Sequence, residues 1–212
     1  MTKIKVCGIQ QWEAAKWAVD AGADAVGFIF ADSRRKVSME RAAAISGSLP
    51  GGILKIGVFV NASKEDLQSA VEMVNLDYVQ LHGDESPEFC RSLGIPYIKA
   101  VSIKEKDDLD ILPEYGGDMV LVDSGKGPYR GGNGTSFDWD YLKDSQTGDR
   151  KLILAGGLQK GNVREAIQKV RPYMVDVSSG VESSGIKDKE KIMKFIKEVR
   201  EVNSEMESGE LK

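Results

Sequence analysis

The stretch "KLILAGGLQKGNVREAIQKVRPYMVDVSSG", residues 151–180, decides the fold of this chain. A short apolar run ends in two glycines, an amphipathic helical pattern follows, and a second apolar run ends in Ser-Ser-Gly. Such an alternation of strand, helix and strand favours parallel strands that are joined by right-handed crossovers. The stretch therefore predicts an α/β protein with a parallel sheet.

The same strand–helix unit recurs along the chain. Its apolar runs, in order, are IKVCGI, AVGFIF, KIGVFV, YVQLHG, YIKAVSI, DMVLVDSG, KLILAGG and MVDVSSG. Eight such units close a (β/α)8 barrel, so we predict an α/β fold consisting of a TIM barrel. An open doubly wound sheet is the alternative, but it usually has fewer strands at this length, and no G-x-G-x-x-G motif follows the first run.

The chain is expected to form a single domain. Its 212 residues suffice for one sizeable core, and no linker or shift in composition divides them. We expect the barrel to span residues 1–202. Residues 203–212 are polar and charged, and we expect them to form a frayed C-terminal tail.

Composition and charge limit the classes of partner. The chain is 41% hydrophobic and 29% charged, and its formal charge of −4 gives no electrostatic footprint for nucleic acid or an anionic membrane. No apolar run approaches the ~20 residues of a spanning helix, and Lys3 and Lys5 interrupt any signal peptide. Cys7 and Cys90 follow no disulfide pattern, which fits a reducing compartment. We therefore expect a cytoplasmic protein, a monomer or homodimer, with no nucleic-acid or membrane partner.

Side chains with useful chemistry collect at one end of the predicted strands. In a TIM barrel the C-terminal strand ends carry the active site, whereas the opposite face carries stability. The residues at or just beyond these ends include Cys7, Arg34, Arg35, Gln80, His82, Asp123, Gly156, Gly157, Asp176, Ser179 and Gly180. A thiol, two acids, the only histidine and several small residues at one rim predict an active site there.

The last two strand ends predict a phosphate site. Gly156 and Gly157 follow one strand, and Ser179 and Gly180 follow the next, so backbone amides can approach a ligand closely. A short helix that begins at Ser179 would add free N–H groups, and the loops after strands seven and eight commonly bind phosphate in this fold. Tight turns that merely need glycine are the alternative.

An acid and a thiol predict proton transfer at the same rim. Asp123 ends an apolar strand, where partial desolvation raises a carboxyl pKa toward a value useful for a general acid. A loop cap is the alternative role. The Cys7 thiol has an ordinary pKa near ~8.5 and can remove a proton as a thiolate. Cys90, by contrast, is expected to be a buried, inert cysteine. The glycine-rich loop 124–136 is a possible lid.

Three other residues at the rim have less specific signals. His82 could orient a substrate or take part in catalysis, although a single histidine is more often structural. Nothing near it has the spacing of metal ligands, so we predict neither a metal site nor a cofactor. Arg34 or Arg35 could pair with a carboxylate through its planar guanidinium.

Together these motifs resemble the phosphoribosylanthranilate isomerase family of tryptophan biosynthesis. The segments that carry the resemblance are KVCGI, ADAVGFIF, GVFVN, VQLHGDE, LVD with GGNGTSFDW, LAGGL with NV, and VDVSSGVE with GIKD. They run in order from Lys3 to about Ile196. Any one of them alone would be weakly specific, but their joint occurrence is specific to this family.

The resemblance implies a cofactor-free Amadori rearrangement of a phosphosugar, N-(5-phosphoribosyl)anthranilate. By resemblance, Asp123 is the general acid that opens the ribose ring and Cys7 is the general base at C2′. It also places Arg35 at the anthranilate carboxylate and Asp176 at the sugar hydroxyls, and we expect His82 to bind substrate as well. The phosphate would be bound by Gly156, Gly157, Ser179 and Gly180.

Two departures from the family pattern and two rival functions stay open. Lys36 follows the arginines where the family more often has an aromatic or apolar residue, and the adjacent Arg34 and Arg35 leave the carboxylate partner undecided. One rival is an isomerase of a histidine-pathway aminoaldose, which has an aspartate in place of Cys7. The other is a barrel that binds a phosphorylated metabolite without catalysis, for which neither Cys7 nor Asp123 would be needed.

Overall fold

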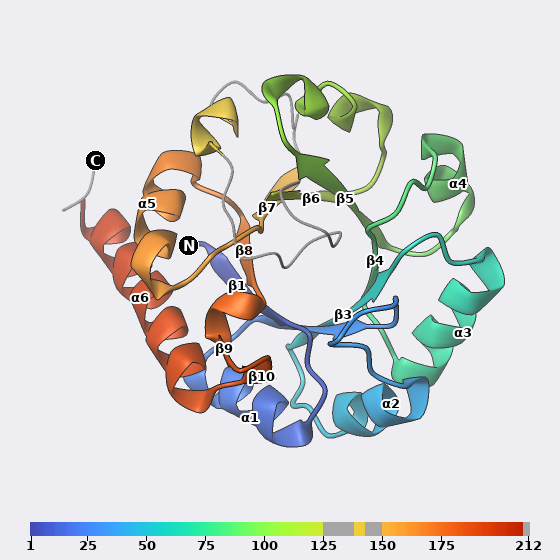
Figure 1. The fold of residues 1–212 in the computed structure, drawn as a ribbon, viewed down its shortest axis with the longest axis horizontal. Coiled ribbons are helices and arrows are strands. Elements are labelled where there is room, and N and C mark those ends of the chain that lie inside the picture. Colours follow the sequence, from blue (N-terminus) through green and yellow to red (C-terminus); the bar gives the residue numbers. More distant parts are fainter. Residues whose placement is uncertain (125–137, 143–149, 210–212) are drawn as a thin grey trace.

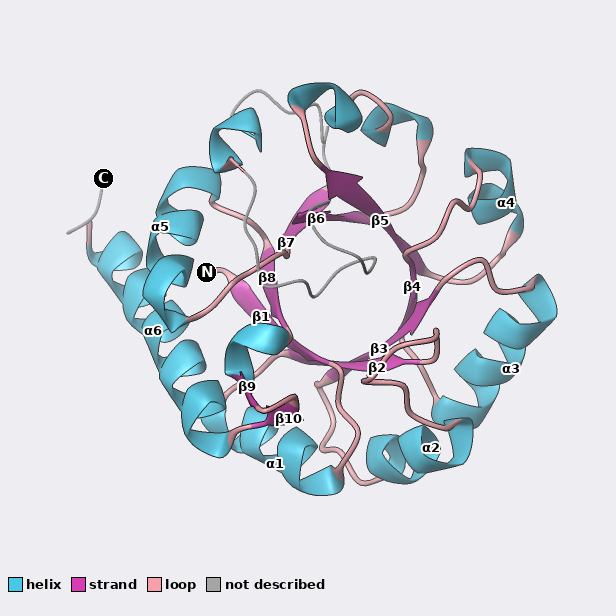
Figure 2. Ribbon diagram, in the orientation of Figure 1, coloured by secondary structure: helices cyan, strands magenta, loops and turns pink. Residues whose placement is uncertain are grey.

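A computed structural model of the chain describes residues 1–124, 138–142 and 150–209. Eight parallel strands form a closed barrel in chain order, with β8 paired to β1, and helices surround the barrel (Figures 1 and 2). The predicted TIM barrel is thereby confirmed, and the open doubly wound sheet is excluded. The strands are β1 Lys3–Cys7, β2 Ala25–Ile29, β3 Leu54–Phe59, β4 Tyr78–Leu81, β5 Tyr97–Ile103, β6 Met119–Ser124, β7 Lys151–Leu154 and β8 Met174–Val177.

Helices follow most of the strands. The α-helices are α1 Trp12–Ala21, α2 Met39–Gly47, α3 Lys64–Val74, α4 Pro87–Ser92, α5 Lys160–Val170 and α6 Lys189–Ser208. The 3₁₀ helices are η1 Lys106–Leu109, η2 Leu112–Glu114, η3 Trp139–Leu142 and η4 Ser179–Val181. A small antiparallel sheet of β9 Glu182–Ser183 and β10 Ile186–Lys187 lies between η4 and α6.

Local chemistry sets where several helices begin and end. Ser38, Ser63 and Ser86 each accept a hydrogen bond from the backbone N–H three residues later, so each caps a helix N-terminus. Gly22 ends α1 with a left-handed backbone at φ 101°. After β5 the expected helix is instead two 3₁₀ helices, and the Asp108 carboxylate accepts from the backbone N–H groups of residues 104 and 105, which caps the start of η1.

Alternation along the strands creates two apolar layers. Side chains at odd and even positions of a strand point to opposite faces. In β1, for example, Ile4 and Val6 join the core between barrel and helices, whereas Lys5 lies fully buried on the other face. The barrel interior is a separate cluster of Ala25, Ile56, Ile98, Ala100, Met119, Leu121, Ile153, Ala155 and Met174. A packed apolar cluster therefore fills the barrel interior below the active-site end.

The C-terminal helix extends past the expected domain boundary at residue 202. Asn203 is buried, and its side-chain amide donates to the Thr2 carbonyl at 2.9 Å and accepts from the Thr2 N–H at 2.8 Å. This contact holds α6 against the start of β1, so residues 203–208 continue the helix despite their polar composition. Residues 210–212 lie outside the described part of the chain.

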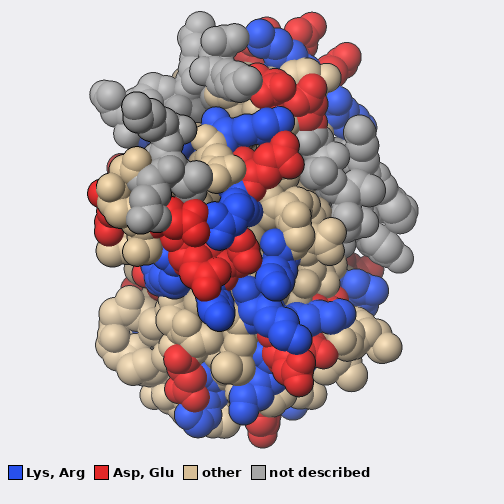
Figure 3. All heavy atoms as spheres, turned by 90° about the vertical axis from the view of Figure 1, so that its left-hand side faces the viewer, with Lys and Arg blue, Asp and Glu red and all other residues tan. Residues whose placement is uncertain are grey.

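Charges of both signs are interspersed on the face formed by α5 and α6 (Figure 3). Arg164 of α5 pairs with Glu198 and Glu205 of α6 and ties the two helices together. Within α6, Lys194 pairs with Glu190 one turn away. Among the described residues no helix has the length and apolar character required to cross a membrane.

Candidate active site

The C-terminal strand ends surround one cavity of about 630 Å³. Of the residues that the sequence predicted for this rim, those that line the cavity are Cys7, Arg34, Arg35, Gln80, His82, Asp123, Gly156, Gly157, Asp176 and Ser179. Gly180 does not line it, because its Cα packs against the loop after β7, where an added Cβ would lie 2.0 Å from the Leu158 carbonyl oxygen. The possible lid at residues 124–136 lies, apart from Ser124, outside the described residues.

Cys7 and Asp123 reach the cavity from different sides of the barrel. Cys7 is the last residue of β1, and Asp123 lies near the end of β6, with β7 and β8 between the two strands. The Cys7 side chain fits closely against Gly27 of β2, where an added Cβ would lie 2.6 Å from the Cys7 sulfur. Both residues are nearly inaccessible to solvent, with exposures of 5% for Cys7 and 4% for Asp123.

Burial gives Asp123 an unusual proton affinity. Desolvation, reinforced by the negative charge of Asp176, raises the pKa of Asp123 to about 7. Hydrogen bonds from Ser124 act in the opposite direction but are outweighed. The His82 Nε2 atom lies 3.8 Å from the Asp123 carboxylate. Asp123 is therefore partly protonated at neutral pH, as a general acid requires.

Burial also raises the pKa of the Cys7 thiol above its ordinary value. The positive charges of Lys5 and Lys187 oppose this effect, whereas the charge of Asp176 reinforces it. Two cations thus partly offset the cost of burying a thiolate at Cys7.

A buried network supports the cavity from below. The Lys5 ammonium donates to the Asp176 carboxylate at 2.7 Å and to the Gln80 side-chain oxygen at 3.0 Å. The Gln80 amide in turn lies 3.2 Å from His82 Nδ1. The second Asp176 oxygen, Oδ1, is buried and has no hydrogen-bond partner among the described residues, although Asp176 lines the cavity. Asp176 therefore has an unused acceptor atom beside the cavity.

Lys5 was missed by the sequence analysis as a site residue. Its signal was present, because Lys5 and Cys7 are two positions apart in one strand and so point to the same face. A lysine on the inward face of a barrel strand is costly to bury unless it is paired. Its partners lie on β4 and β8, and strand alternation alone does not identify them.

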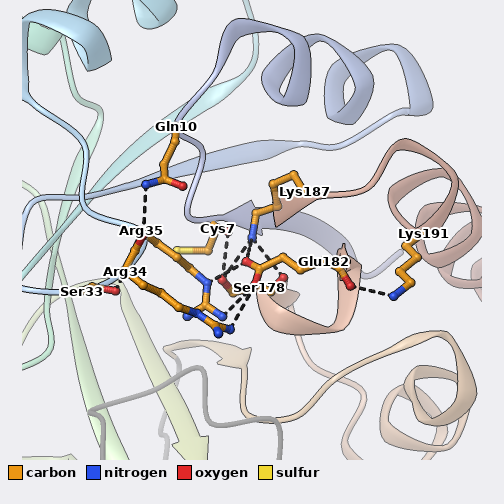
Figure 4. Close-up of polar contacts among 9 residues, drawn as sticks. All are labelled: Cys7, Gln10, Ser33, Arg34, Arg35, Ser178, Glu182, Lys187 and Lys191. Carbon is orange, nitrogen blue, oxygen red and sulfur yellow. Dashed lines mark hydrogen bonds and ion pairs between the residues drawn. The ribbon is translucent and has the colours of Figure 1, made fainter. Parts of the chain in front are cut away.

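A second network fixes the arginines (Figure 4). The Glu182 carboxylate accepts from Arg35 Nε at 2.7 Å and from Arg35 Nη2 at 3.0 Å, and it also accepts from Lys187 at 2.6 Å. Arg35 is 6% exposed, whereas the Arg34 side chain is 61% exposed and reaches Glu182 only at 3.3 Å. Arg35 is therefore the arginine that is held in place at the cavity, with two of its three nitrogens engaged by Glu182.

The backbone at the predicted phosphate end requires glycine. Gly156 and Gly157 adopt left-handed φ angles of 85° and 64°. A Cβ at Gly156 would lie 2.9 Å from the Asp123 carboxylate and 2.4 Å from the Ser124 nitrogen, so glycine is required there. The short helix predicted after β8 is present as η4 and begins at Ser179. In the described ranges no group of three His, Cys, Asp or Glu side chains is placed to hold a metal ion.

Fold and site together define the class of this protein: an enzyme built on a (β/α)8 barrel, with acid–base groups and small strand-end residues around one cavity. Comparisons with known proteins identify the family. The family model for N-(5'phosphoribosyl)anthranilate (PRA) isomerase matches residues 4–198. The N-(5'-phosphoribosyl)anthranilate isomerase of Bacillus cereus is 49% identical over 199 residues, which cover 93% of this chain and 98% of that protein.

Solved structures agree with this result. The crystal structure of phosphoribosyl anthranilate isomerase from Thermotoga maritima superposes with a TM-score of 0.87 at 41% identity, covering 95% of this chain and all of the other. A phosphoribosyl anthranilate isomerase in complex with reduced 1-(o-carboxyphenylamino)-1-deoxyribulose 5-phosphate superposes with a TM-score of 0.84 at 40% identity and the same coverage. This chain belongs to the phosphoribosylanthranilate isomerase family, and the predicted family and isomerase class are confirmed.

Proposed function

We propose that the chain converts N-(5-phosphoribosyl)anthranilate to 1-(2-carboxyphenylamino)-1-deoxyribulose 5-phosphate in tryptophan biosynthesis, with Asp123 as general acid and Cys7 as general base. Membership of the isomerase family supports the reaction. The observation that carries the assignment of roles is that Asp123 and Cys7 face one cavity from β6 and β1. No cofactor is needed, because the reaction only moves protons and shifts double bonds.

Ring opening is the first step. The protonated Asp123 donates its proton to the ribose ring oxygen, and the bond between that oxygen and C1′ breaks. The lone pair of the anilino nitrogen forms a Schiff-base cation with C1′. A pKa of about 7 suits Asp123 for this step, because a substantial fraction of the carboxyl carries a proton at neutral pH.

Proton removal at C2′ is the second step. The Cys7 thiolate takes the C2′ proton, and the C–H electrons neutralise the Schiff base to give an enolamine. The enolamine then tautomerises to the ketone, so the product is an isomer of the substrate. The cationic Schiff base favours the thiolate electrostatically, because an opposite charge nearby offsets the cost of burial.

The remaining residues are proposed to hold the substrate. The free Oδ1 of Asp176 is suited to accept hydrogen bonds from sugar hydroxyls. Glu182 engages Nε and Nη2 of Arg35, which leaves Nη1 as the donor proposed for the anthranilate carboxylate. Gly156, Gly157 and Ser179 are proposed to bind phosphate at the cavity surface, whereas Gly180 is proposed to act by shaping the turn. His82 is proposed as a further substrate contact.

Turnover of freshly made phosphoribosyl anthranilate, followed by fluorescence, tests the proposal. Cys7→Ala and Asp123→Asn are each expected to abolish turnover and to leave affinity for a product analogue nearly unchanged, because both residues act on proton transfer. Near-full kcat in either variant would remove the role given to that residue. The histidine-pathway aminoaldose, assayed in parallel, is expected to react far more slowly; equal rates would favour the rival isomerase.

Location and assembly stay predictions. The cytoplasmic location rests on the two unpaired cysteines, Cys7 and Cys90. One solved structure is of monomers of the dimeric phosphoribosylanthranilate isomerase from Thermotoga maritima, and either a monomer or a homodimer is expected for this chain. Light scattering of the purified protein decides between them.

A further inference from the structure

Two lysine ammonium groups lie behind the cavity wall beside Cys7. Lys5 precedes Cys7 by two residues in β1 and is fully buried, and Lys187 of β10 is 8% exposed. Neither lysine lines the cavity, so neither is placed to touch a substrate. We propose that Lys5 and Lys187 are positioning residues that favour the thiolate form of Cys7 and so offset part of the cost of burying it. This inference rests on the proposed role of Cys7 as the base.

Lys5 approaches the thiol from within the same strand. A lysine ammonium has three N–H donors. One donates to Asp176 at 2.7 Å and one to Gln80 at 3.0 Å. Both partners are on other strands, Asp176 on β8 and Gln80 on β4. Lys5 is therefore held in one position on the face of β1 that also carries Cys7.

Lys187 approaches from the β9–β10 sheet. Its ammonium donates to Glu182 at 2.6 Å, to the Ser178 carbonyl at 3.0 Å and to the Ser178 hydroxyl at 3.3 Å. The Ser178 hydroxyl donates in turn to the Cys7 carbonyl at 3.1 Å. Figure 4 shows the amino group of Lys187 directed at Ser178 and Glu182. Through Ser178, the sheet therefore fixes a second cation beside the Cys7 residue.

The charges around Cys7 leave room for one more anion. The groups from the surrounding elements are the cations Lys5, Lys187 and Arg35 and the anions Asp176 and Glu182, while Gly27 on β2 has no charge. Asp123, across the cavity, is largely neutral below a pH of about 7. Below that pH three buried cations face two anions. A thiolate at Cys7 then lies among groups whose net charge is positive, which favours the thiolate.

A purely structural role for the two lysines is the alternative, and Lys99 provides a matched control. Lys99 is 3% exposed and pairs with Glu85 at 2.7 Å, so its burial and its ion pair resemble those of Lys5. Neither Lys99 nor Glu85 lines the cavity. Lys99→Met therefore removes a comparable buried ion pair but leaves the surroundings of Cys7 intact.

The test measures the thiolate directly. In a Cys90→Ala background Cys7 is the only thiol, and its alkylation by iodoacetamide can be followed by intact mass between pH 6 and pH 9. Lys5→Met and Lys187→Met are each expected to slow alkylation at pH 7.5 by about tenfold, as for a rise of one unit in the thiol pKa. Lys99→Met is expected to stay within about twofold of the parent, and Lys187→Arg is expected to restore most of the rate. Lys187→Met disturbs the surrounding ion pairs less than Lys5→Met does. In Lys187→Met the Glu182 carboxylate is still paired with Arg35, whereas in Lys5→Met the Asp176 carboxylate loses its paired cation.

Steady-state kinetics of turnover provide a second, independent measurement. Both methionine variants are expected to lower kcat with little change in KM, since neither lysine lines the cavity. Unchanged alkylation in both variants would overturn the inference, and a change in only one would overturn the part assigned to the other lysine. If Lys5→Met does not fold, Lys187→Met still decides. If Cys7→Ala retains turnover while the lysine variants slow alkylation, the proposed function fails but the effect of the lysines on the thiol stands.

Discussion

Replacing Asp123 by asparagine should make the protein more stable while it removes the proposed acid. Burial raises the pKa of Asp123 from 3.8 to about 7, so the folded chain binds a proton that the unfolded chain has released between these two values. Stability falls as the pH rises through that interval and is level above it. The carboxylate therefore destabilises the fold at pH 8, whereas asparagine stays neutral at every pH.

The size of the effect follows from the pKa difference. Each pH unit between the two pKa values contributes about 1.4 kcal/mol to the free energy of unfolding. Over the whole interval from 3.8 to about 7, the loss of unfolding free energy caused by ionising Asp123 is at most about 4 kcal/mol. From pH 5 to pH 8, only the part below pH 7 counts, which gives about 3 kcal/mol.

Urea unfolding of the parent and of Asp123→Asn, followed by circular dichroism at several pH values from 5 to 8, measures this difference. The advantage of the variant should grow by about 3 kcal/mol up to pH 7 and then stay constant. Asp20→Asn, on an exposed aspartate of α1 that pairs with Lys16, corrects for the loss of one carboxylate from the surface charge. Parallel stability curves for the parent and Asp123→Asn would refute the reasoning, because they would show that Asp123 titrates alike in both states.

Two further predictions concern the reaction. Arg35→Ala should raise KM by roughly tenfold to a hundredfold with a smaller effect on kcat, because a charge-assisted hydrogen bond to a carboxylate contributes about 1.5–3 kcal/mol. Steady-state kinetics of this variant, with Arg34→Ala as the comparison, measure the change. An effect confined to Arg34→Ala would assign the anthranilate carboxylate to Arg34 instead. The value of kcat/KM should rise with pH up to about pH 7 and then stay level, because each gain in Cys7 thiolate above pH 7 is offset by a loss of protonated Asp123. It should fall only above the raised pKa of the Cys7 thiol. A decline that starts at pH 7 would place the thiol pKa below that of the acid.

The strand ends made much of the site predictable. Each apolar run identified the side chain that follows it, and parallel strands in a barrel bring those ends to one rim. Cys7, Asp123 and Asp176 therefore line one cavity although they lie far apart in the sequence. The two glycines after β7 were identified in the same way.

Contacts between distant elements could not be predicted in this way. Glu182 and Lys187 follow the last strand as ordinary charged residues, and only the β9–β10 sheet brings them to Arg35. The choice between Arg34 and Arg35 likewise depends on burial, which a polar loop without periodicity does not reveal. Asn203 lies in a polar segment, and its contact with Thr2 spans nearly the whole chain.

Closure of the ring between β1 and β8 has a consequence for biosynthesis of the protein. The segment that bears Cys7 leaves the ribosome before the other strands of the barrel, yet its neighbour Asp176 is on the last of them. Until β8 emerges, the ammonium of Lys5 lacks its carboxylate partner and one edge of β1 has nothing to pair with. A nascent chain should therefore gain activity abruptly, once β8 has been made and has paired with β1, rather than strand by strand.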